Sequence, residues 1–295
     1  MTLTQLRYFL SIVDAGTMSG ASRQVGIAQP AISLQLARLE EELGQTLFVR
    51  HGRGMTPTEM GQRLHGWAIE ILRQVDLAKE DLSGDPDSPS GTVSIGMSTA
   101  ANMAFSVDLL MLARRRFPKL RVQHVESMSG FLLEWVERGR IDMAVVYDVP
   151  PHAFLVVETL MKEELYLIAS SAMATPYGAS TLPFDALSTV PLIIPGRQHR
   201  LGQLLHRLAE AQGVDLQIVA EVDSTYSIKK LVSRREGFSI LSLHAVQEEL
   251  DRGELRAIPI REPAVTRSVD LVINPMRRLN SSVLAMRNLL AELVS

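Results

Sequence analysis

Residues 17–42, TMSGASRQVGIAQPAISLQLARLEEE, constrain the fold of this chain more than any other stretch. Their spacing predicts two short helices joined by a tight turn at Gly26, with Pro30 in the first turn of the second helix, where a missing N–H does no harm. Four apolar residues of that second helix recur at intervals of 4, 3 and 4 and are predicted to face inward: Ile32, Leu36, Leu39 and Leu43. The same spacing leaves a largely polar face outside.

The outward face of this helix carries side chains suited to a DNA groove. It comprises Gln29, Pro30, Ser33, Leu34, Gln35 and Arg38. Glutamine can form paired hydrogen bonds with adenine, and serine accepts several geometries, so both residue types fit a helix in the major groove. A solvated polar face on an ordinary helical bundle has the same spacing, and spacing alone leaves both interpretations open.

A basic stretch punctuated by glycine follows this helix. Residues 47–61, LFVRHGRGMTPTEMG, predict a hairpin in which Arg50 and Arg53 contact the DNA backbone or the adjacent minor groove. A hairpin beside a recognition helix is a wing, so this order of elements favours a winged helix-turn-helix. Residues 1–60 carry five arginines against five acidic side chains. Because their net charge is zero, affinity for DNA has to come from placed contacts and from more than one copy.

A long apolar seam runs through residues 58–82 at helical spacing. Its members are Met60, Leu64, Trp67, Ile71, Val75, Ala78 and Leu82. The short N-terminal domain lacks the surface to cover all of it, so we expect a second copy of the same helix to pair with it. Packing of the seam against the chain's own later domain is the alternative. The polar, proline-bearing residues 83–91 that follow predict a hinge.

From residue 92 onward, strands and helices alternate, which predicts an α/β fold. A long extended stretch, 155–170, leaves a first α/β unit, and a later strand with the terminal helix returns to it after a second unit. We therefore expect two lobes linked by two crossings, lobe I at about 92–160 and 267–295 and lobe II at about 161–266. The cleft of such a clamshell is the expected ligand site.

Hydroxyl residues stand at several predicted junctions between a strand and a helix. Ser98 and Thr99 follow the first strand, Ser129 opens a helix after the second, and Ser224 opens one in lobe II. Hydroxyls beside the free N–H groups of helix N-termini favour an anionic or carbonyl-bearing ligand. Ordinary helix capping explains each hydroxyl taken alone, and their convergence from both lobes is what favours a site.

Residues 1–61 resemble the winged helix-turn-helix of LysR-type transcriptional regulators. The resemblance is carried in register by Ala21, Gln29, Pro30, Ala31, Ser33, Leu39, Glu40, Leu43, Gly44, Leu47, Phe48, Arg50, Arg53, Thr58 and Gly61. The segments AQPAIS, RGMTPTEMG and GRIDMAVVYD are similar to the nitrogen-assimilation type within this family.

Two positions depart from the family pattern in the N-terminal region. Ala28 stands where a capping Ser or Thr is common, and Leu34 stands where a polar, frequently basic, residue is common. Leu34 can instead contact a thymine methyl group, which would change base preference without removing DNA binding.

Residues 92–294 resemble LysR-type effector domains more weakly. The resemblance implies a periplasmic-binding-protein-like clamshell, with effector contacts at Ser98, Thr99, Ser129 and the loop after Pro195. In that loop Arg197, His199 and Arg200 can supply a cation for an acidic effector, and a solvated basic loop is the alternative. The family's usual Gly-x-Gly in the second lobe reads Arg235-Glu236-Gly237 here, which leaves the detailed shape of that lobe open.

Motifs for catalysis and metal binding are missing from the sequence. The chain holds no cysteine, none of the phosphate-binding or hydrolase motifs, and seven histidines without metal-ligand spacing. The paired acids 163–164 and 248–249 are interpreted as solvated faces. We therefore expect no metal, no cofactor and no enzymatic activity. No apolar run approaches the roughly 20 residues of a membrane helix, and no secretory signal is visible, which predicts a cytoplasmic protein without a membrane partner.

The expected architecture is an all-α winged helix-turn-helix at 1–58, a dimerisation helix and hinge at 59–91, and a two-lobed α/β effector domain at 92–295. The expected function is sequence-specific transcriptional regulation. Its expected partners are double-stranded promoter DNA, a small-molecule effector and further copies of the chain in a dimer or tetramer, with RNA polymerase as a further candidate. The alternative is a solute-binding or enzymatic α/β protein whose N-terminal bundle only mediates assembly. Constitutive DNA binding without an effector is a third hypothesis.

Overall fold

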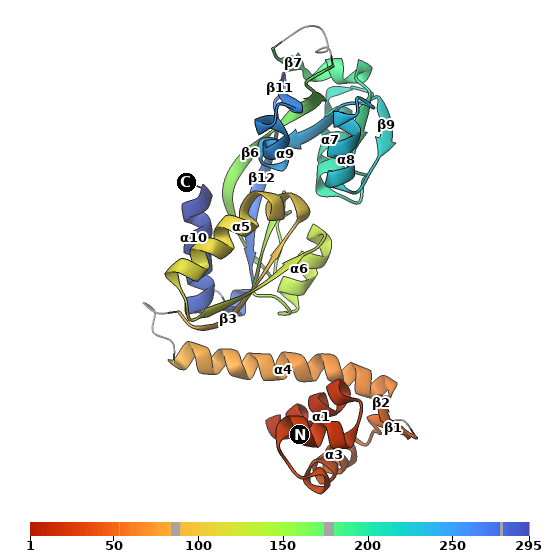
Figure 1. Ribbon diagram of the computed structural model, residues 1–295, viewed down its shortest axis with the longest axis vertical. Coiled ribbons are helices and arrows are strands. Elements are labelled where there is room, and N and C mark those ends of the chain that lie inside the picture. The colour runs from red at the N-terminus through yellow and green to blue at the C-terminus, as the bar shows by residue number, and fades with distance from the viewer. Residues whose placement is uncertain (53, 84–88, 174–179, 278–279, 295) are drawn as a thin grey trace. The chain divides into compact units, whose positions relative to one another are not determined.

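The computed structural model describes residues 1–52, 54–83, 89–173, 180–277 and 280–294, with the backbone alone for residues 73, 77, 80–83 and 277 (Figure 1). The chain divides into two compact units, Met1–Ser83 and Gly84–Ser295. Each unit has its own apolar core, so each is described by itself.

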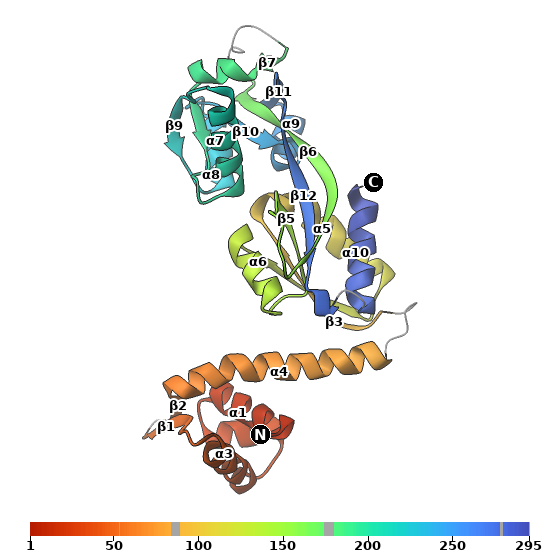
Figure 2. The same ribbon diagram turned by 180° about the vertical axis from the view of Figure 1, so that it is seen from behind.

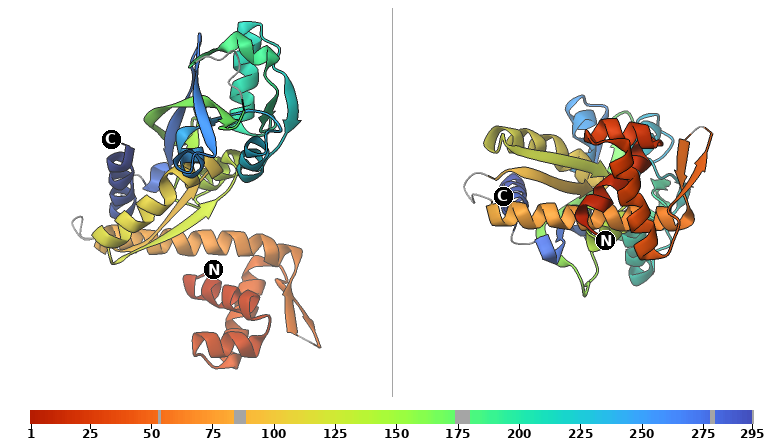
Figure 3. Two further views of the ribbon diagram at one scale, coloured as in Figure 1. Left: turned by 45° about the horizontal axis from the view of Figure 1, so that its top comes forward. Right: turned by 90° about the horizontal axis from the view of Figure 1, so that it is seen from below.

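The N-terminal unit is a bundle of short helices with a hairpin and one long helix. Its elements are α1 (Leu3–Ala15), α2 (Met18–Val25), α3 (Gln29–Leu43), β1 (Phe48–His51), β2 (Gly54–Pro57) and α4 (Glu59–Ser83). Leu6 and Phe9 of α1 and Ile32 and Leu39 of α3 are buried in one core. The antiparallel hairpin β1–β2 extends away from the three short helices (Figure 3). The predicted winged helix-turn-helix is confirmed.

Local contacts explain the helix boundaries of this unit. The Thr17 hydroxyl caps α2 by accepting the Gly20 N–H at 3.0 Å. Glycine inside a helix costs about 1 kcal/mol relative to alanine, but a Cβ at Gly20 would lie 2.7 Å from the Thr17 Oγ1 and 2.9 Å from the Ala15 Cβ. Close packing of the two helices therefore requires the glycine.

One inward-facing prediction in α3 is wrong. Ile32, Leu36 and Leu39 are buried as expected, but Leu43 is 38% exposed. Leu43 is the last residue of α3, and Gly44 reverses the chain directly after it in a left-handed conformation. The last turn of the helix is left uncovered by the rest of this unit, so helical spacing alone overestimates the length of the buried face.

The apolar seam of α4 is partly used within its own unit. Met60, Leu64 and Ile71 pack against the core of the winged domain, while Trp67 is 64% exposed. The side chain of Leu82 lies outside the described residues. The winged domain thus covers only part of the seam, and Trp67 remains on the surface of this unit.

Lobe I of the C-terminal unit is a sheet with helices on both faces. Its strands are β3 (Gly91–Met97), β4 (Leu120–Glu126) and β5 (Met143–Tyr147), which pair in parallel in the order β4-β3-β5. The helices α5 (Thr99–Arg116) and α10 (Ser281–Val294) cover one face, and α6 (Ser129–Glu137) covers the other (Figure 1). All five residues of β5 are buried, as expected for a strand covered on both sides.

Lobe II is built around the far halves of two long strands. It holds β7 (Leu182–Pro183), the 3-10 helix η2 (Phe184–Thr189), β8 (Leu192–Ile194), α7 (Arg200–Gln212), β9 (Ile218–Glu221), α8 (Thr225–Ser233), β10 (Ser239–Ser242), α9 (Leu243–Asp251) and β11 (Leu255–Arg261). The sequence pattern did not indicate α9 or β11. A nine-residue helix gives little periodicity, and Pro259 interrupts the strand pattern of β11.

The two predicted crossings between the lobes are the strands β6 (Val156–Ser170) and β12 (Val265–Ile273). They pair antiparallel along the whole of β12 and run side by side from one lobe to the other (Figures 1 and 2). The far part of β6 pairs with β10 and β11 of lobe II. One continuous sheet therefore joins the lobes, and the predicted two-lobed α/β clamshell is confirmed.

The departure from the family's Gly-x-Gly does not disturb lobe II. Arg235 adopts φ 70°, a left-handed conformation that suits glycine better than arginine. A Cβ at Gly237 would lie 2.9 Å from the Pro191 carbonyl oxygen, so the second glycine of the pattern is kept where backbone segments approach closely.

Candidate functional site

The outward face of α3 presents a row of side chains to solvent. Gln29, Pro30, Leu34 and Arg38 are exposed, and Ser33 and Gln35 are half-buried beside them. Leu34 is 52% exposed, which leaves its methyl groups accessible to a partner. All six predicted residues therefore keep solvent contact on α3, with Ser33 and Gln35 partly covered.

The first turn of α3 lacks a side-chain cap. Ala28 makes no capping hydrogen bond, as its residue type predicts, and Pro30 occupies the first turn. The uncapped N–H groups at this end carry the positive end of the helix dipole, which favours a phosphate group.

The hairpin supplies the second surface of this candidate DNA interface. Phe48 is buried beneath it, while Arg50 is exposed and pairs across the hairpin with Met55. The Met55 N–H donates to the Gly16 carbonyl at 2.8 Å, which fixes the hairpin to the turn between α1 and α2. Arg53, the other predicted wing residue, lies outside the described residues.

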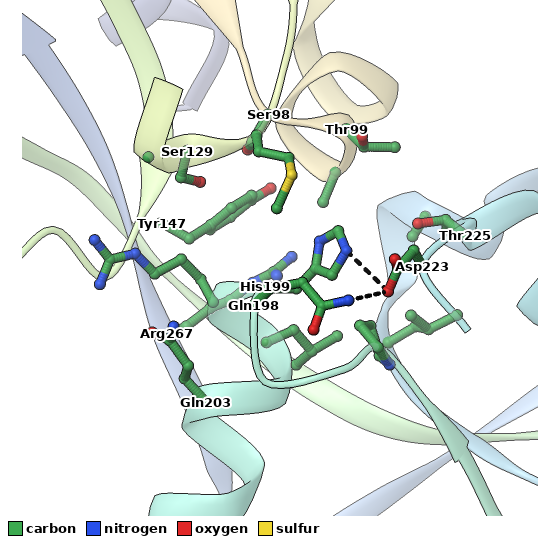
Figure 4. Close-up of a pocket in the computed structure, with 18 of the residues that line it drawn as sticks. Ser98, Thr99, Ser129, Tyr147, Gln198, His199, Gln203, Asp223, Thr225 and Arg267 are labelled. Carbon is green, nitrogen blue, oxygen red and sulfur yellow. Dashed lines mark hydrogen bonds and ion pairs between the residues drawn. The ribbon is translucent and has the colours of Figure 1, made fainter. Parts of the chain in front are cut away.

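A cavity of about 250 Å³ lies between the two lobes of the C-terminal unit. Its lining comes from both lobes and from β12: Ser98, Thr99, Ala100, Ser127, Met128, Ser129, Gly130 and Tyr147 of lobe I, Pro195, Gln198, His199, Arg200, Leu201, Gln203, Asp223, Thr225, Leu241, Ser242 and Ala245 of lobe II, and Arg267. Figure 4 shows Ser98, Ser129 and Tyr147 on one side of this space and His199 and Asp223 on another.

Five helices begin at this cavity. The lining includes the first residue or the N-cap of α5, α6, α7, α8 and α9. Of these five, only α8 has a side-chain cap, in which the Ser224 hydroxyl accepts the Ser227 N–H at 3.3 Å. The other four helices present first-turn N–H groups without such a cap, and each directs the positive end of its helix dipole to this cavity.

The structure distinguishes the hydroxyl residues that line the cavity from one that only caps a helix, a distinction that the sequence could not make. Ser98, Thr99 and Ser129 line the cavity, and so does Pro195. Ser224 does not line it and acts as a helix cap.

Arg197 is also outside the lining. It is exposed, and its Nη2 lies 3.2 Å from the His206 Nδ1. Arg200, from the same loop and helix start, lines the cavity instead.

Side chains from lobe II form a polar cluster at the cavity. The Asp223 carboxylate lies 3.2 Å from the His199 Nε2 and accepts a hydrogen bond from the Gln198 amide at 2.7 Å (Figure 4). Asp223 and Gln198 were not singled out from the sequence. Both stand in loops without a motif, so only the fold shows that they meet.

A buried ion pair lies at the base of the cavity, where β6 and β12 pass from one lobe to the other. The Arg267 Nε and Nη2 donate to the Glu163 Oε2 at 2.7 and 2.6 Å, and both side chains are 5% exposed. The His244 Nδ1 approaches the other Glu163 oxygen at 3.4 Å. The guanidinium of Arg267 lies over the Tyr147 ring at 3.6 Å from its centroid, a cation–π contact.

The interpretation of both paired acids as solvated is wrong. Glu163 is buried because β6 and β12 place it directly opposite Arg267. Glu249 is buried too, and its carboxylate lies 2.9 Å from the Lys229 Nζ. Only their neighbours Glu164 and Glu248 keep contact with solvent. Glu163 and Glu164 are neighbours on β6 and point to opposite faces of the sheet. Glu249 is one of the buried residues of the helix α9, and the pattern of charges alone revealed neither arrangement.

Within the described part of the chain, no group of three or more His, Cys, Asp or Glu residues has the geometry of a metal site. Within the same residues, every helix falls short of the length and apolar content that crossing a membrane requires.

Two family descriptions match the chain. "Bacterial regulatory helix-turn-helix protein, lysR family" matches residues 3–62, and "LysR substrate binding domain" matches residues 86–295. Together they cover the winged unit and the two-lobed unit.

Curated relatives match along most or all of the chain. The nitrogen assimilation regulatory protein nac of Klebsiella aerogenes is 30% identical over 297 residues, covering 100% of this chain and 96% of the relative. The regulator BbuR of Bordetella bronchiseptica is 32% identical over 263 residues, covering 88% of this chain and 81% of the relative.

Solved structures share the fold over the full length. A full-length OxyR variant from Pseudomonas aeruginosa has a TM-score of 0.72 at 20% identity, covering 100% of this chain and 94% of that one. CbnR in complex with its target DNA has a TM-score of 0.70 at 20% identity, covering 99% of this chain and 100% of that one.

Proposed function

The chain belongs to the LysR family of transcriptional regulators, and we propose that it binds promoter DNA through α3 and the hairpin under control of a small anionic or carbonyl-bearing effector in the cavity. Members of this family bind promoter DNA and small-molecule effectors and form oligomers. The matched proteins are regulators, so the alternative of an enzyme or a solute-binding protein is not favoured.

The proposed DNA contacts follow from exposure and residue type. Gln29, Ser33 and Gln35 offer hydrogen bonds to base edges, and Leu34 offers methyl contact to thymine. Pro30 positions the start of the helix. Arg38, Arg50 and Arg53 are assigned to phosphate or minor-groove contacts, which position the protein without reading sequence.

The proposed effector class rests on one observation above all, the five helix N-termini that begin at the cavity. Four of them lack a side-chain cap, and their N–H groups favour an anion or a carbonyl oxygen. Ser98, Thr99 and Ser129 supply hydroxyls at two of these helix starts. Pro195 and Arg200 border the space from lobe II, and Arg200 replaces Arg197 as the candidate cation.

We propose that two copies pair through α4. Its exposed Trp67 and Ala78, with the half-buried Val75, offer an apolar surface that the winged domain leaves at least partly uncovered. Pairing doubles the number of recognition helices, which compensates for the zero net charge of residues 1–60. We further propose that two such dimers associate and that the protein contacts RNA polymerase. Its proposed place of action is the cytoplasm, where it reaches promoter DNA. In this proposal residues 1–58 read DNA, 59–91 pair and link, and 92–295 respond to the effector.

The match to nac supports a narrower grouping. The segments AQPAIS, RGMTPTEMG and GRIDMAVVYD resemble the nitrogen-assimilation type, and the nac relative aligns along the whole chain. We therefore place this chain with that type as a proposal about its targets.

Footprinting on the chain's own upstream DNA tests the DNA-binding part. We expect a protected site that random DNA does not show, and a change in the extent of protection when a carboxylate effector is added. Gln29→Ala and Arg53→Ala should each weaken specific binding. If both variants bind the specific site as tightly as the wild type, the contact assignment is wrong. If the footprint never responds to a small acid, constitutive DNA binding becomes the better hypothesis.

A further inference from the structure

Two buried hydroxyl groups at the cavity have no hydrogen-bond partner. Tyr147 is 3% exposed and Ser98 is 8% exposed, and both line the cavity. Among the described residues, neither the Tyr147 hydroxyl nor the Ser98 Oγ makes a hydrogen bond. Leaving a buried polar group unpaired costs about 1–3 kcal/mol. Such groups are retained where a ligand supplies the missing hydrogen-bond partner. These two hydroxyl groups lie on the same side of the cavity (Figure 4).

The position of the Tyr147 hydroxyl is fixed by the rest of its side chain. The ring belongs to the buried core of lobe I, and the Arg267 guanidinium covers one ring face at 3.6 Å. Arg267 is itself held by Glu163 through contacts of 2.6 and 2.7 Å. The phenol oxygen is therefore held in place before a ligand arrives, which lowers the entropy cost of binding to it.

The Tyr147 hydroxyl is a neutral donor. Burial raises the pKa of this phenol above its usual value, and this outweighs the opposing effect of the Arg267 charge. The proton therefore stays on the oxygen at neutral pH. A serine hydroxyl can also donate, so the two groups together can serve two lone pairs of one acceptor oxygen.

We propose that Tyr147 is an effector-binding residue, and that its hydroxyl and that of Ser98 together bind one oxygen of a carboxylate or carbonyl group on the effector. This inference rests on the proposed role of the cavity as the effector site. The subsite itself is close to neutral because Glu163 balances Arg267 at 2.6 Å. The ligand oxygen is therefore recognised by donated hydrogen bonds and by the start of α5, of which Ser98 is the N-cap.

The burial of both oxygens links this subsite to lobe movement. Ser98 and Tyr147 belong to lobe I, and Figure 4 shows His199 of lobe II on another side of the same cavity. Since both oxygens are out of contact with solvent, a ligand reaches them only when covering groups move aside. A ligand bound there favours the arrangement in which they are accessible, so binding shifts the balance between lobe arrangements.

The test uses the full chain and a matched set of probes. These are the carboxylates acetate, succinate and benzoate, the amides acetamide and benzamide, and the amines ethylamine and benzylamine, which lack an acceptor oxygen. Thermal shift and calorimetric titration are measured for the wild type, Tyr147→Phe and Ser98→Ala. Tyr166→Phe is the control for Tyr147, because its hydroxyl bonds Glu164 away from the cavity. Ser239→Ala is the control for Ser98, because its hydroxyl is buried and unpartnered but lies outside the lining.

We expect at least one carboxylate or amide, and neither amine, to stabilise the wild type. Tyr147→Phe and Ser98→Ala should each weaken that binding roughly tenfold to a hundredfold, while both controls bind as the wild type does. Tyr147→Phe without ligand should melt no lower than the wild type, since the ring and its contact with Arg267 are kept.

Three results would overturn the proposal. Equal affinity in Tyr147→Phe removes its hydroxyl from the site while leaving the cavity as the effector site. A lower melting temperature of Tyr147→Phe without ligand means that the hydroxyl has a structural partner. Failure of every carboxylate and amide to bind the wild type rejects the ligand class itself. The DNA-binding function is then tested separately by the footprint on upstream DNA.

Discussion

The proposed DNA-reading face of α3 comes from one uninterrupted stretch, residues 29–38, whereas the cavity is lined from seven separate segments between residues 98 and 267. On α3, helical periodicity alone decides which side chains share a face. In the cavity, the crossing strands bring together residues that have no spacing relation. The two sites also differ in burial, because the α3 side chains are mostly exposed while Tyr147 and Arg267 are buried. Substitutions should therefore separate function from stability on α3 and couple them at the base of the cavity.

The largest expected effect is at Glu163. Glu163→Gln leaves the Arg267 charge buried without its partner, which should lower the free energy of unfolding of the C-terminal unit by about 3–5 kcal/mol. Urea unfolding followed by circular dichroism measures this. The adjacent Glu164→Gln is the matched control, because its pair with Arg261 is partly solvated and should contribute about 1 kcal/mol or less. Equal effects of the two substitutions would remove the distinction between a buried and a solvated acid.

The α3 side of the comparison is tested at Gln29. Gln29→Ala should weaken binding to the footprinted site by about 1–3 kcal/mol, because a paired hydrogen bond to a base is lost. Its effect on random DNA and on the melting temperature should be small, since the side chain is exposed. Gel-shift titrations on both DNAs give the two affinities, and Gln62→Ala, an exposed glutamine of α4, is the control. A comparable loss on both DNAs would mean that Gln29 contacts the backbone rather than a base.

Two serines at helix starts sharpen the comparison within the effector domain. Ser224→Ala removes the cap of α8 and should cost about 1 kcal/mol of stability without changing ligand affinity. Ser98→Ala removes no capping hydrogen bond, so it should leave the stability of the protein unchanged or slightly higher. It should, however, lower the affinity for the ligand. Melting curves with and without benzoate or acetate distinguish the two patterns. Identical behaviour of the two variants would contradict the assignment of one serine to capping and the other to the site.

The smallest expected effect is at Leu34. Leu34→Ala should reduce affinity by about 1 kcal/mol or less, and only for sites with thymine at the contacted position, since the lost contact is apolar. Binding to a series of single-base variants of the footprinted site measures this. Uniform loss across the series would show that Leu34 is not responsible for base preference.

Much of the DNA-binding unit could be predicted from the sequence because its determinants are local. The turn at Gly26, the uncapped start at Ala28 and the capping Thr17 all act within a few residues. Leu43 is the exception, since its exposure depends on whether another element covers the last turn of α3.

The cavity could be predicted only in part. Ser98, Thr99 and Ser129 were found because hydroxyls at helix starts have a recognisable local context. Tyr147 and Arg267 lie within strands whose sequence pattern indicates burial and nothing more. Arg197, His199 and Arg200 could not be ranked from the sequence, because a loop sequence does not show which of its basic residues turns inward.

The sequence by itself determined the winged helix-turn-helix, the exposed residues of α3 and most of the order of elements, with α9 and β11 as the exceptions. These depend on periodicity and on short-range hydrogen bonds, which act between neighbours in the chain. The tertiary structure alone decided that Glu163 faces Arg267, that Arg267 covers Tyr147, and that five helices begin around one space. The register of β6 against β12 places Glu163 opposite Arg267, and the pairing of β12 with β5 brings Arg267 close to Tyr147. A register between distant strands has no signature in either strand alone.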